Sequence, residues 1–428
     1  MLKGYAGTGK TTVVSALVRV LGTFGYKYVL LAPTGRAAKV MASYSGRQAS
    51  TIHKRIYRQA ANPYSEGLTF NRQANKNTHT LFIVDEASMI SDDKAFGDSG
   101  LLEDLLGYVF ESKTNKLLLI GDTAQLPPVN QALSPSLDAA YMSSHFRCRV
   151  HELELRQVMR QAEESGILMN ATNLRNQLTQ KDPQLKFYTK RYRDIYRMTG
   201  EKLEDGLRYA YHKFGVENTT VICRSNKNAN LYNQHIRRQI FFAEDEIGVG
   251  DYLMVVRNNY FWLPKDSSIG FMANGDFVEI TKIIRFEELY GFRFAEVRLR
   301  FVDYPEEVEL EVKIMLDTLY CESPSLPAAD NQKLYNEVLQ DYQDLKTKKE
   351  KSQAMKQNPH LNALQVKFAY ALTCHKAQGG QWKAVFVDHG FLKDDMISQE
   401  FARWLYTATT RASEELYLLN MHQELIGD

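Results

Sequence analysis

Cysteine is scarce in this chain, which has four cysteines among its 428 residues. None of them forms a C-x-x-C pair, so neither a zinc site nor a disulfide framework is indicated, and we expect reduced residues that serve packing. Long apolar runs are missing as well, which argues against a signal peptide and a membrane span. The cysteines are Cys148, Cys223, Cys321 and Cys374. These absences predict a cytoplasmic protein with no membrane partner.

An excess of either charge is also missing, because 53 lysines and arginines face 51 aspartates and glutamates, for a net charge of +2. This balance decides neither for nor against nucleic acid, since acidic surface elsewhere can offset a basic groove. Binding must therefore be argued from local motifs. The length predicts roughly two to four domains.

A glycine-rich loop, "GYAGTGKT", lies near the start of the sequence. It fits G-x-x-x-x-G-K-[ST], in which glycines let backbone N–H groups turn toward phosphates. Lys10 would reach the β- and γ-phosphates, and Thr11 would hold Mg²⁺. The apolar run over 11–21 predicts a helix closed by Gly22, whose N-terminus would face the phosphates. The predicted phosphate-binding residues are Gly4, Gly7, Thr8, Gly9, Lys10, Thr11 and Thr12.

Two later segments supply the other groups that hydrolysis of a triphosphate needs. "TLFIVDEAS", residues 80–88, predicts a buried parallel strand that ends in Asp85 and Glu86. Asp85 would bind Mg²⁺ through water, and Glu86 would orient and deprotonate the attacking water. A third strand, residues 116–122, leads to Gln125, whose amide would sense the γ-phosphate. Alone, the first segment also fits a strand that meets a solvated turn, and the second also fits a proline-rich turn.

The pattern along the chain predicts an α/β protein with two insertions. Alternating strand and helix signals over 2–160 indicate one parallel lobe, and strands at 219–225, 366–374, 384–390 and 415–420 indicate a second. Polar arms around residues 62–67 predict a hairpin. Alternating residues from about 273 to 320 predict a small β-barrel, which is followed by a polar helical stretch.

The motifs together resemble superfamily 1B helicases, the branch that includes RecD and Dda. In the first half these are "APTGRAAK", "ASTIHK", "DEAS", "GDTAQLPPV" and "LRQVMRQ". In the second half they are "VICRSNKNANLYNQHIR", "ANGD", "ALTCHKAQGGQW" and "LYTATTRA". The matches occur in order and span nearly the whole chain, which makes the resemblance specific.

The resemblance implies two RecA-like P-loop NTPase lobes, with a β-hairpin insertion in the first and an SH3-like β-barrel insertion in the second. The predicted boundaries are 1–160 for the first lobe with 54–79 as a strand-separating pin, 161–272 and 365–428 for the second lobe, and 273–364 for the barrel and its helical extension. Family members carry an adenine-binding segment and a full first strand before the phosphate loop, where this sequence has only Met1 to Lys3. We therefore expect that the first strand is missing, and we assign no adenine contact.

The resemblance also implies ATP and Mg²⁺ as cofactors and assigns roles to residues. The catalytic set is Lys10, Glu86, Gln125, Arg160 and Arg411; Gln378 joins the nucleotide-binding set; Thr11 and Asp85 are the metal ligands; and the DNA-binding set is Thr34, His53, Tyr64, Asn274, Thr373 and His375. Arg160 is preferred to Arg156 as the phosphate-contacting arginine. We expect Arg411 on a helix from about 398 to 412, which would bring it to the phosphates from the second lobe.

The implied activity is ATP-driven movement on single-stranded DNA, 5′ to 3′, with unwinding at single-strand to duplex junctions in DNA repair, recombination or replication. We expect a monomer, with recombination-complex subunits as possible partners. Two alternatives stay open. One is a component like the exonuclease V alpha subunit, because Glu311 and Lys313 with Asp303 offer a weak nuclease pattern. The other is a nucleic-acid-stimulated ATPase without unwinding, and RNA as its substrate is a related alternative, since no residue here reads a 2′-hydroxyl.

Overall fold

The chain is described from a computed structural model, which divides it into two compact units. Unit 1 comprises Met1–Arg58, Phe70–Arg224 and Leu372–Asp428, and unit 2 comprises Gln59–Thr69 and Ser225–Ala371. The structure describes residues 1–60, 69–92, 99–129, 131, 133–157, 164–180, 183–264, 267, 271–304, 306–392 and 397–428. Arg160 and Tyr64, which were predicted as catalytic and DNA-binding residues, lie outside the described residues. None of the described helices is long and apolar enough to cross a membrane.

Unit 1 contains a six-stranded sheet with the order β3-β2-β6-β7-β1-β8. Its strands are β1 (Leu2–Gly4), β2 (Lys27–Ala32), β3 (Ala49–Thr51), β6 (Thr80–Val84), β7 (Lys116–Gly121) and β8 (Leu153–Leu155). Neighbouring strands pair in parallel. This confirms the predicted parallel lobe, in which helices must connect successive strands.

The expectation that the first strand is missing is wrong. Leu2 aligns with Ile120 of β7 on one side and with Leu153 of β8 on the other, so β1 lies between two partners. Three residues suffice here because Leu2 is buried in the core and Gly4 leads directly into the phosphate loop. The strand runs parallel to both neighbours, so its carboxyl end lies at the same edge of the sheet as theirs.

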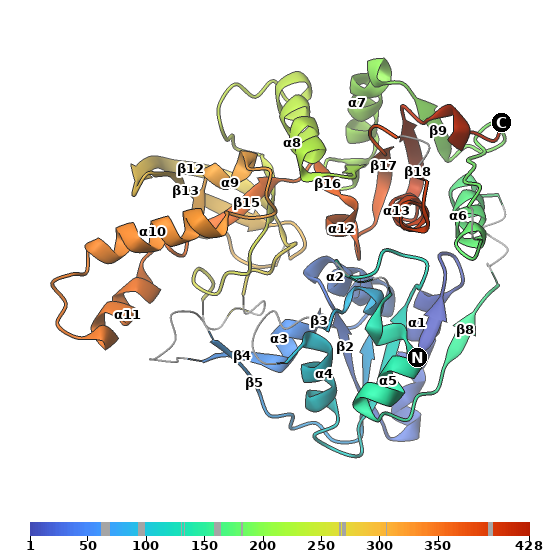
Figure 1. Ribbon diagram of the computed structural model, residues 1–428, viewed down its shortest axis with the longest axis horizontal. Helices are drawn as coiled ribbons and strands as arrows, with labels where there is room; N and C mark the ends of the chain where they lie inside the picture. Colours follow the sequence, from blue (N-terminus) through green and yellow to red (C-terminus); the bar gives the residue numbers. More distant parts are fainter. Residues whose placement is uncertain are drawn as a thin grey trace. The chain divides into compact units, whose positions relative to one another are not determined.

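Helices cover both faces of this first sheet, as a parallel sheet requires. They include α1 (Lys10–Val20), α2 (Gly35–Ser45), α3 (Ile52–Ile56), α4 (Leu101–Val109) and α5 (Ala139–Phe146). Successive strand residues point to opposite faces. Leu30 and Ile83 accordingly pack with Val14 of α1, whereas Leu31 and Phe82 pack in a second core cluster with residues of α4. Helices α1 and α2 contact one another (Figure 1).

The first helix ends later than expected. Helix α1 runs to Val20 and continues as a 3₁₀ turn, Leu21–Phe24, which Gly25 closes at φ 73°. Gly22, predicted as the closing residue, lies inside this turn. The chain can form this tighter 3₁₀ turn because Leu21 stays buried in the core, and the space beside Gly22 is open.

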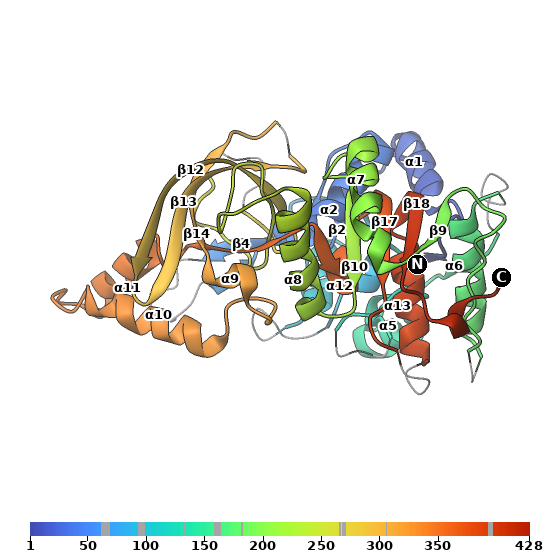
Figure 2. The same ribbon diagram turned by 90° about the horizontal axis from the view of Figure 1, so that it is seen from above.

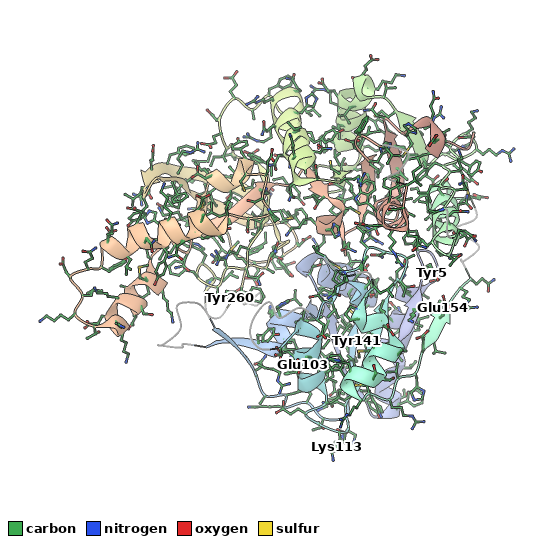
Figure 3. All side chains as sticks on the ribbon, viewed as in Figure 1. Tyr5, Glu103, Lys113, Tyr141, Glu154 and Tyr260 are labelled. Carbon is green, nitrogen blue, oxygen red and sulfur yellow. The ribbon has the colours of Figure 1, made fainter. Side chains whose placement is uncertain are left out.

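Unit 1 also contains a five-stranded sheet with the order β16-β10-β17-β18-β9. Its strands are β9 (Ile195–Met198), β10 (Thr219–Cys223), β16 (Ala371–Thr373), β17 (Trp382–Asp388) and β18 (Ala412–Leu419), and its helices include α6 (Gly166–Gln177), α7 (Leu203–Phe214), α12 (Cys374–Ala377) and α13 (Gln399–Thr409). Helix α7 contacts β10 and β17, and α13 contacts β17 and β18; Figure 2 shows the two helices on opposite sides of the sheet. This is the second parallel lobe that the sequence predicts.

Unit 2 is built on a closed barrel of β11 (Tyr252–Val255), β12 (Phe277–Leu289), β13 (Phe292–Phe301), β14 (Leu310–Met315) and β15 (Leu364–Phe368). The predicted barrel is thereby confirmed, although it extends beyond the predicted range of 273–364 on both sides. The segment 366–374, predicted as one strand, is two: β15 closes the barrel and β16 joins the five-stranded sheet. Pairing with β11 accounts for the break, because Val366 and Phe368 align with Val255 and Leu253.

Helices complete unit 2. They are α8 (Asn226–His235), which continues as a π-helical turn over Ile236–Ile240, and α9 (Asp317–Tyr320), α10 (Ala328–Gln340) and α11 (Lys348–Gln357). Leu334 and Val338 of α10 and Met355 of α11 pack with Phe294 of the barrel in one apolar cluster. The polar helical stretch predicted after the barrel is therefore held to it by a buried apolar face. The predicted hairpin has arms β4 (Tyr57–Ala60) and β5 (Thr69–Arg72), which form a two-stranded sheet.

Candidate nucleotide-hydrolysis site

The glycine-rich loop connects β1 to α1 and leaves the first turn of that helix open. Gly7 and Gly9 have φ of 74° and 86°, a left-handed conformation that other residues rarely adopt. Gly9 stands at the N-cap of α1, where no side chain caps the helix. The first N–H groups and the positive end of the helix dipole are therefore available to an anion. Thr11 and Thr12, the predicted phosphate and metal contacts, are exposed in this first turn.

The loop also holds its lysine. The Lys10 ammonium donates to the carbonyl of Gly4 at 2.7 Å and to that of Tyr5 at 3.0 Å, and the Thr8 hydroxyl donates to Tyr5 O at 2.8 Å. These bonds keep the cation against the loop, beside the backbone N–H groups. A Cβ on Gly4 would meet Thr8 Oγ1 at 2.7 Å, so this position requires glycine. The residues present fit a bound polyphosphate.

Strand β6 delivers the two predicted carboxylates to this site. Asp85 accepts a hydrogen bond from the Tyr44 hydroxyl at 2.5 Å and one from the Glu86 N–H at 2.8 Å, so its carboxylate is fixed in place. Glu86 adopts φ 50° and ψ 36°, which costs a non-glycine residue about 1 kcal/mol. Such strain is typical of positions whose side-chain direction matters for function.

Glu86 lies where several charges act on it. Burial raises the pKa of the Glu86 carboxyl, and the Asp85 charge raises this pKa further. The positive charges of Arg411 and Lys10 lower it, and Arg411 has the larger effect of the two. A carboxyl with a raised pKa is a better general base, because its proton affinity is closer to that of the groups it serves. Asp122 also raises this pKa, so the five residues that share the field come from the phosphate loop, the ends of β6 and β7, and the residue before β18.

Gln125 lies in a turn that follows β7. The Asp122 carboxylate accepts a hydrogen bond from the Ala124 N–H at 2.9 Å, and the Gln125 N–H donates to Asp122 O at 3.3 Å. The Gln125 side chain is buried, yet its Oε1 has no hydrogen-bond partner among the described residues. Buried polar atoms are normally paired. This oxygen is therefore suited to contact a water or ligand, as the predicted phosphate sensor would.

Arg411 follows α13 rather than lying on it, because that helix ends at Thr409. The helical expectation up to residue 412 is thus wrong: Ala412 already pairs with Trp382 as the first residue of β18. The buried guanidinium donates to Thr407 O at 3.1 Å, Gly380 O at 3.2 Å and Thr410 Oγ1 at 3.2 Å. Its acceptors are neutral, and it forms no salt bridge with a described carboxylate.

Helix α13 contacts the Gln125 turn through three residues that the sequence prediction missed. The Arg403 guanidinium donates to Thr123 O, and the Thr407 hydroxyl accepts a hydrogen bond from the Leu126 N–H at 2.9 Å. The third residue, Tyr406, hydrogen-bonds the phosphate loop and Asp122. Arg403, Tyr406 and Thr407 are at positions i, i+3 and i+4, which share one face of a helix. Their spacing within the predicted helix was the sequence signal that could have identified them as a contact surface.

Gln378 was predicted to bind nucleotide. In the structure its Nε2 donates to Leu126 O at 2.7 Å, so it contacts the residue after Gln125 rather than the phosphate loop. Together with Thr407, it pairs both backbone groups of Leu126. Nucleotide contact by Gln378 stays a prediction, and the observed contact fixes the position of the Gln125 turn.

The residues predicted to bind DNA belong to several different elements. Thr34 caps α2, since its Oγ1 accepts a hydrogen bond from the Ala37 N–H at 3.2 Å. His53 lies on α3, where burial lowers its pKa to about 4, so a contact by this side chain at neutral pH would be a hydrogen bond rather than an ion pair. Thr373 is the N-cap of α12, and His375 is exposed on that helix. Asn274 belongs to unit 2, where its side chain is exposed and its N–H donates to Asn258 Oδ1 at 2.7 Å.

The barrel residues of the alternative nuclease pattern have structural partners. Glu311 pairs with Arg298 at 2.6 Å, and buried Lys313 pairs with Glu287. Glu287 also contacts His360 Nε2 at 3.0 Å. Glu311 and Lys313 are therefore committed to ion pairs within the barrel, which weakens the nuclease alternative. Across the described residues, no group of three or more His, Cys, Asp or Glu side chains could hold a metal ion.

Comparisons with known proteins match both ends of the chain. The AAA domain family matches residues 1–193, and the UvrD-like helicase C-terminal domain family matches residues 368–419. An ATP-dependent RecD2 DNA helicase from Deinococcus radiodurans is 34% identical over 174 residues, which cover 41% of this chain and 21% of that protein. The ATP-dependent DNA helicase dda of Enterobacteria phage T4 is 28% identical over 268 residues, covering 59% and 55%. The chain thus spans about a fifth and about half of these relatives' lengths.

A solved structure supports the fold. It comes from work on DNA unwinding at forked double-stranded DNA by two coordinating Pif1 helicases, and it aligns with 100% of this chain and 89% of its own at a TM-score of 0.51 and 18% identity. The two parallel sheets, the phosphate loop and the arginine beside the second sheet whose charge acts on Glu86 define a two-lobed P-loop nucleoside triphosphatase. With the matches to both end domains and to the RecD2 and Dda helicases, the chain resembles the helicases of superfamily 1B.

Proposed function

We propose that this chain is an ATP-dependent DNA helicase that moves 5′ to 3′ along single-stranded DNA and separates duplexes at junctions. The observation that carries the proposal is that helix α13, which Arg411 follows, hydrogen-bonds the phosphate loop and the Gln125 turn of the first lobe. The Arg411 charge also acts on Glu86 of that lobe. A triphosphate bound by Lys10 would then contact both lobes, so that its hydrolysis changes how strongly the lobes hold together. The names of the RecD2 and Dda relatives, both ATP-dependent DNA helicases, support the same activity.

The residues present fit ATP with Mg²⁺. Lys10 and the open N-terminus of α1 would bind the phosphates, while Thr11 and Asp85 would hold the metal, which would neutralise phosphate charge. Glu86 would accept the proton of the attacking water, and Gln125 would orient that water with its unpaired Oε1. Arg411 would stabilise the charge that builds on the γ-phosphoryl oxygens, a role worth roughly 10³- to 10⁵-fold in rate.

Binding to DNA would use backbone contacts and stacking that do not read sequence. We propose Thr34, His53, Thr373, His375 and Asn274 as contacts, and the hairpin between β4 and β5 as the strand-separating pin. The barrel would belong to the second lobe as an SH3-like insertion. We further propose action in DNA repair, recombination or replication, as a monomer that recombination-complex subunits can join.

The direct test compares unwinding of duplexes that carry a 5′ tail, a 3′ tail or no tail, with DNA and RNA tails in parallel. The proposal predicts ATP-dependent unwinding with the 5′ DNA tail alone. DNA-stimulated ATP hydrolysis without unwinding of any substrate would instead establish the ATPase alternative. Preference for the 3′ tail would refute the direction, and equal use of RNA would refute the DNA specificity.

A further inference from the structure

Tyr406, on α13 of the second lobe, hydrogen-bonds two parts of the first lobe with one oxygen. Its hydroxyl accepts a hydrogen bond from the Ala6 N–H of the phosphate loop at 2.9 Å. The same hydroxyl donates to Asp122 Oδ2 at 2.6 Å. Tyr406 is 1% exposed and Asp122 is equally buried, so water does not compete for these bonds.

The directions of the two bonds follow from chemistry. A backbone N–H can only donate, so the Tyr406 oxygen must accept from Ala6. Burial raises the pKa of the Tyr406 hydroxyl well above its ordinary value, and the nearby Asp122 charge raises it further. The hydroxyl therefore keeps its proton at any pH at which the protein works, and the Asp122 carboxylate receives it. A bond from a neutral donor to a carboxylate is among the stronger kinds of hydrogen bond.

The position of Asp122 extends the effect to Gln125. The other oxygen of its carboxylate accepts a hydrogen bond from the Ala124 N–H at 2.9 Å, and its carbonyl accepts from the Gln125 N–H. Asp122 thus shapes the turn that presents the unpaired Gln125 oxygen. Tyr406 connects this turn and the phosphate loop to the same helix.

We propose that the Tyr406 hydroxyl is a positioning group for ATP hydrolysis, which holds the phosphate loop and the Gln125 turn in register with the second lobe. The inference rests on the proposed function and deepens it. Tyr406 touches neither phosphate nor water in this account. It acts through Ala6 on the loop, and through Asp122 on the residue that orients the water.

Removal of the hydroxyl tests this directly. Tyr406→Phe keeps the ring in the core but leaves a buried N–H and a buried carboxylate oxygen without this partner. Because a hydrogen bond to a charged group is worth about 1.5–3 kcal/mol, we expect kcat for DNA-stimulated ATP hydrolysis to fall roughly 10- to 100-fold. Lys10 and the helix N-terminus remain, so KM and the Kd for ATP should stay within about threefold.

Tyr417→Phe is the matched control. Tyr417 is also a buried tyrosine of the second lobe, and its hydroxyl donates to Glu415 at 2.5 Å on β18. Its loss should leave kcat within about twofold, even if both variants unfold at a lower temperature. Asp122→Asn should lower kcat like Tyr406→Phe, and the double variant should be at most about threefold slower than the slower single variant, because both changes break one connection.

The outcomes separate the two proposals. If the unaltered protein hydrolyses no ATP, the proposed function fails. If it hydrolyses ATP and Tyr406→Phe has the same kcat, the positioning role is refuted. It is also refuted if kcat and ATP binding are lost together with folded structure, or if the two changes multiply in the double variant.

Discussion

Helix starts in this protein come in two kinds, and the difference shows where phosphate can bind. Helix α1 begins after β1 with Gly9 at its N-cap and no capping side chain. Helix α8 begins after β10 with Ser225 at its N-cap, whose hydroxyl accepts a hydrogen bond from the Asn228 N–H at 3.1 Å. Both follow a buried parallel strand, yet one helix N-terminus is open and the other is satisfied by the protein itself. At α1 the open cap combines with the left-handed Gly7 and Gly9 of the preceding loop, and this combination suits the helix start to an anion.

The two lobes also differ in the chemical groups that they supply to the site. The first supplies the phosphate loop, the carboxylates and Gln125. The second supplies hydrogen-bond donors and positive charge from Arg403, Tyr406 and Arg411, on or just after α13. A reaction that spreads negative charge over phosphoryl oxygens needs both kinds of group. Neither lobe holds the whole set, which is why we infer that hydrolysis and lobe movement are coupled.

The largest expected effect comes from removing the cation of the open helix start. Lys10→Ala deletes the ammonium that the loop holds through Gly4 and Tyr5. We expect ATP hydrolysis to fall at least about 1,000-fold and ATP binding to weaken markedly, since nothing replaces a charge at the phosphates. Steady-state turnover and fluorescent-nucleotide titration measure the two effects. Turnover within tenfold of the unaltered protein would show that the open helix start is not the phosphate site.

Glu86→Gln keeps the shape of the site and removes its base. We expect kcat to fall about 10²- to 10⁴-fold, the usual contribution of a general base, while ATP binding is retained. Single-turnover hydrolysis of preformed complexes separates chemistry from binding. Rapid hydrolysis by this variant would remove Glu86 from the mechanism.

These first two positions were predictable from sequence because their chemistry depends on local spacing. Lys10 follows the glycines of one loop, and Glu86 ends one apolar strand. Other features depend on partners distant in sequence. Leu2 forms a strand because Ile120 and Leu153 flank it, and the role of Tyr406 depends on Ala6 and Asp122, which no local pattern connects to it.

The barrel shows the same limit. The alternating pattern of its strands was recognisable in the sequence. Strand β15, however, has the apolar sequence of an ordinary buried strand, and only its pairing with β11 shows that it belongs to the barrel. The sequence therefore could not show that residues 366–374 divide between two sheets. Conversely, the ion pairs of Glu311 and Lys313 only become visible once the strands are adjacent.

A smaller effect is expected in the pH dependence. The pKa of Glu86 is raised, so kcat should fall as the pH drops through a value above the ordinary one for glutamate, because the protonated carboxyl cannot accept a proton. Arg411 is the strongest influence that lowers this pKa. Arg411→Ala should therefore move the acidic limb of the kcat profile to higher pH. If the acidic limb stays in place or moves to lower pH, the Arg411 charge does not lower the pKa of Glu86.

The smallest effect concerns the capped helix start. Ser225→Ala removes the hydroxyl that caps α8, which should destabilise the protein by about 1 kcal/mol. It should leave kcat and ATP binding unchanged, because this helix N-terminus binds no phosphate. Denaturant unfolding and steady-state hydrolysis on the same preparation measure both. A loss of ATP binding would erase the distinction between the two helix starts.

The central claim is that ATP hydrolysis requires a group from each lobe, and Arg411→Ala tests it most directly. ATP affinity and single-turnover hydrolysis should be measured on the same protein in the presence of single-stranded DNA. The account predicts that the variant binds ATP within about threefold of the unaltered protein and hydrolyses it roughly 10³-fold more slowly. Unchanged hydrolysis in the variant would contradict it.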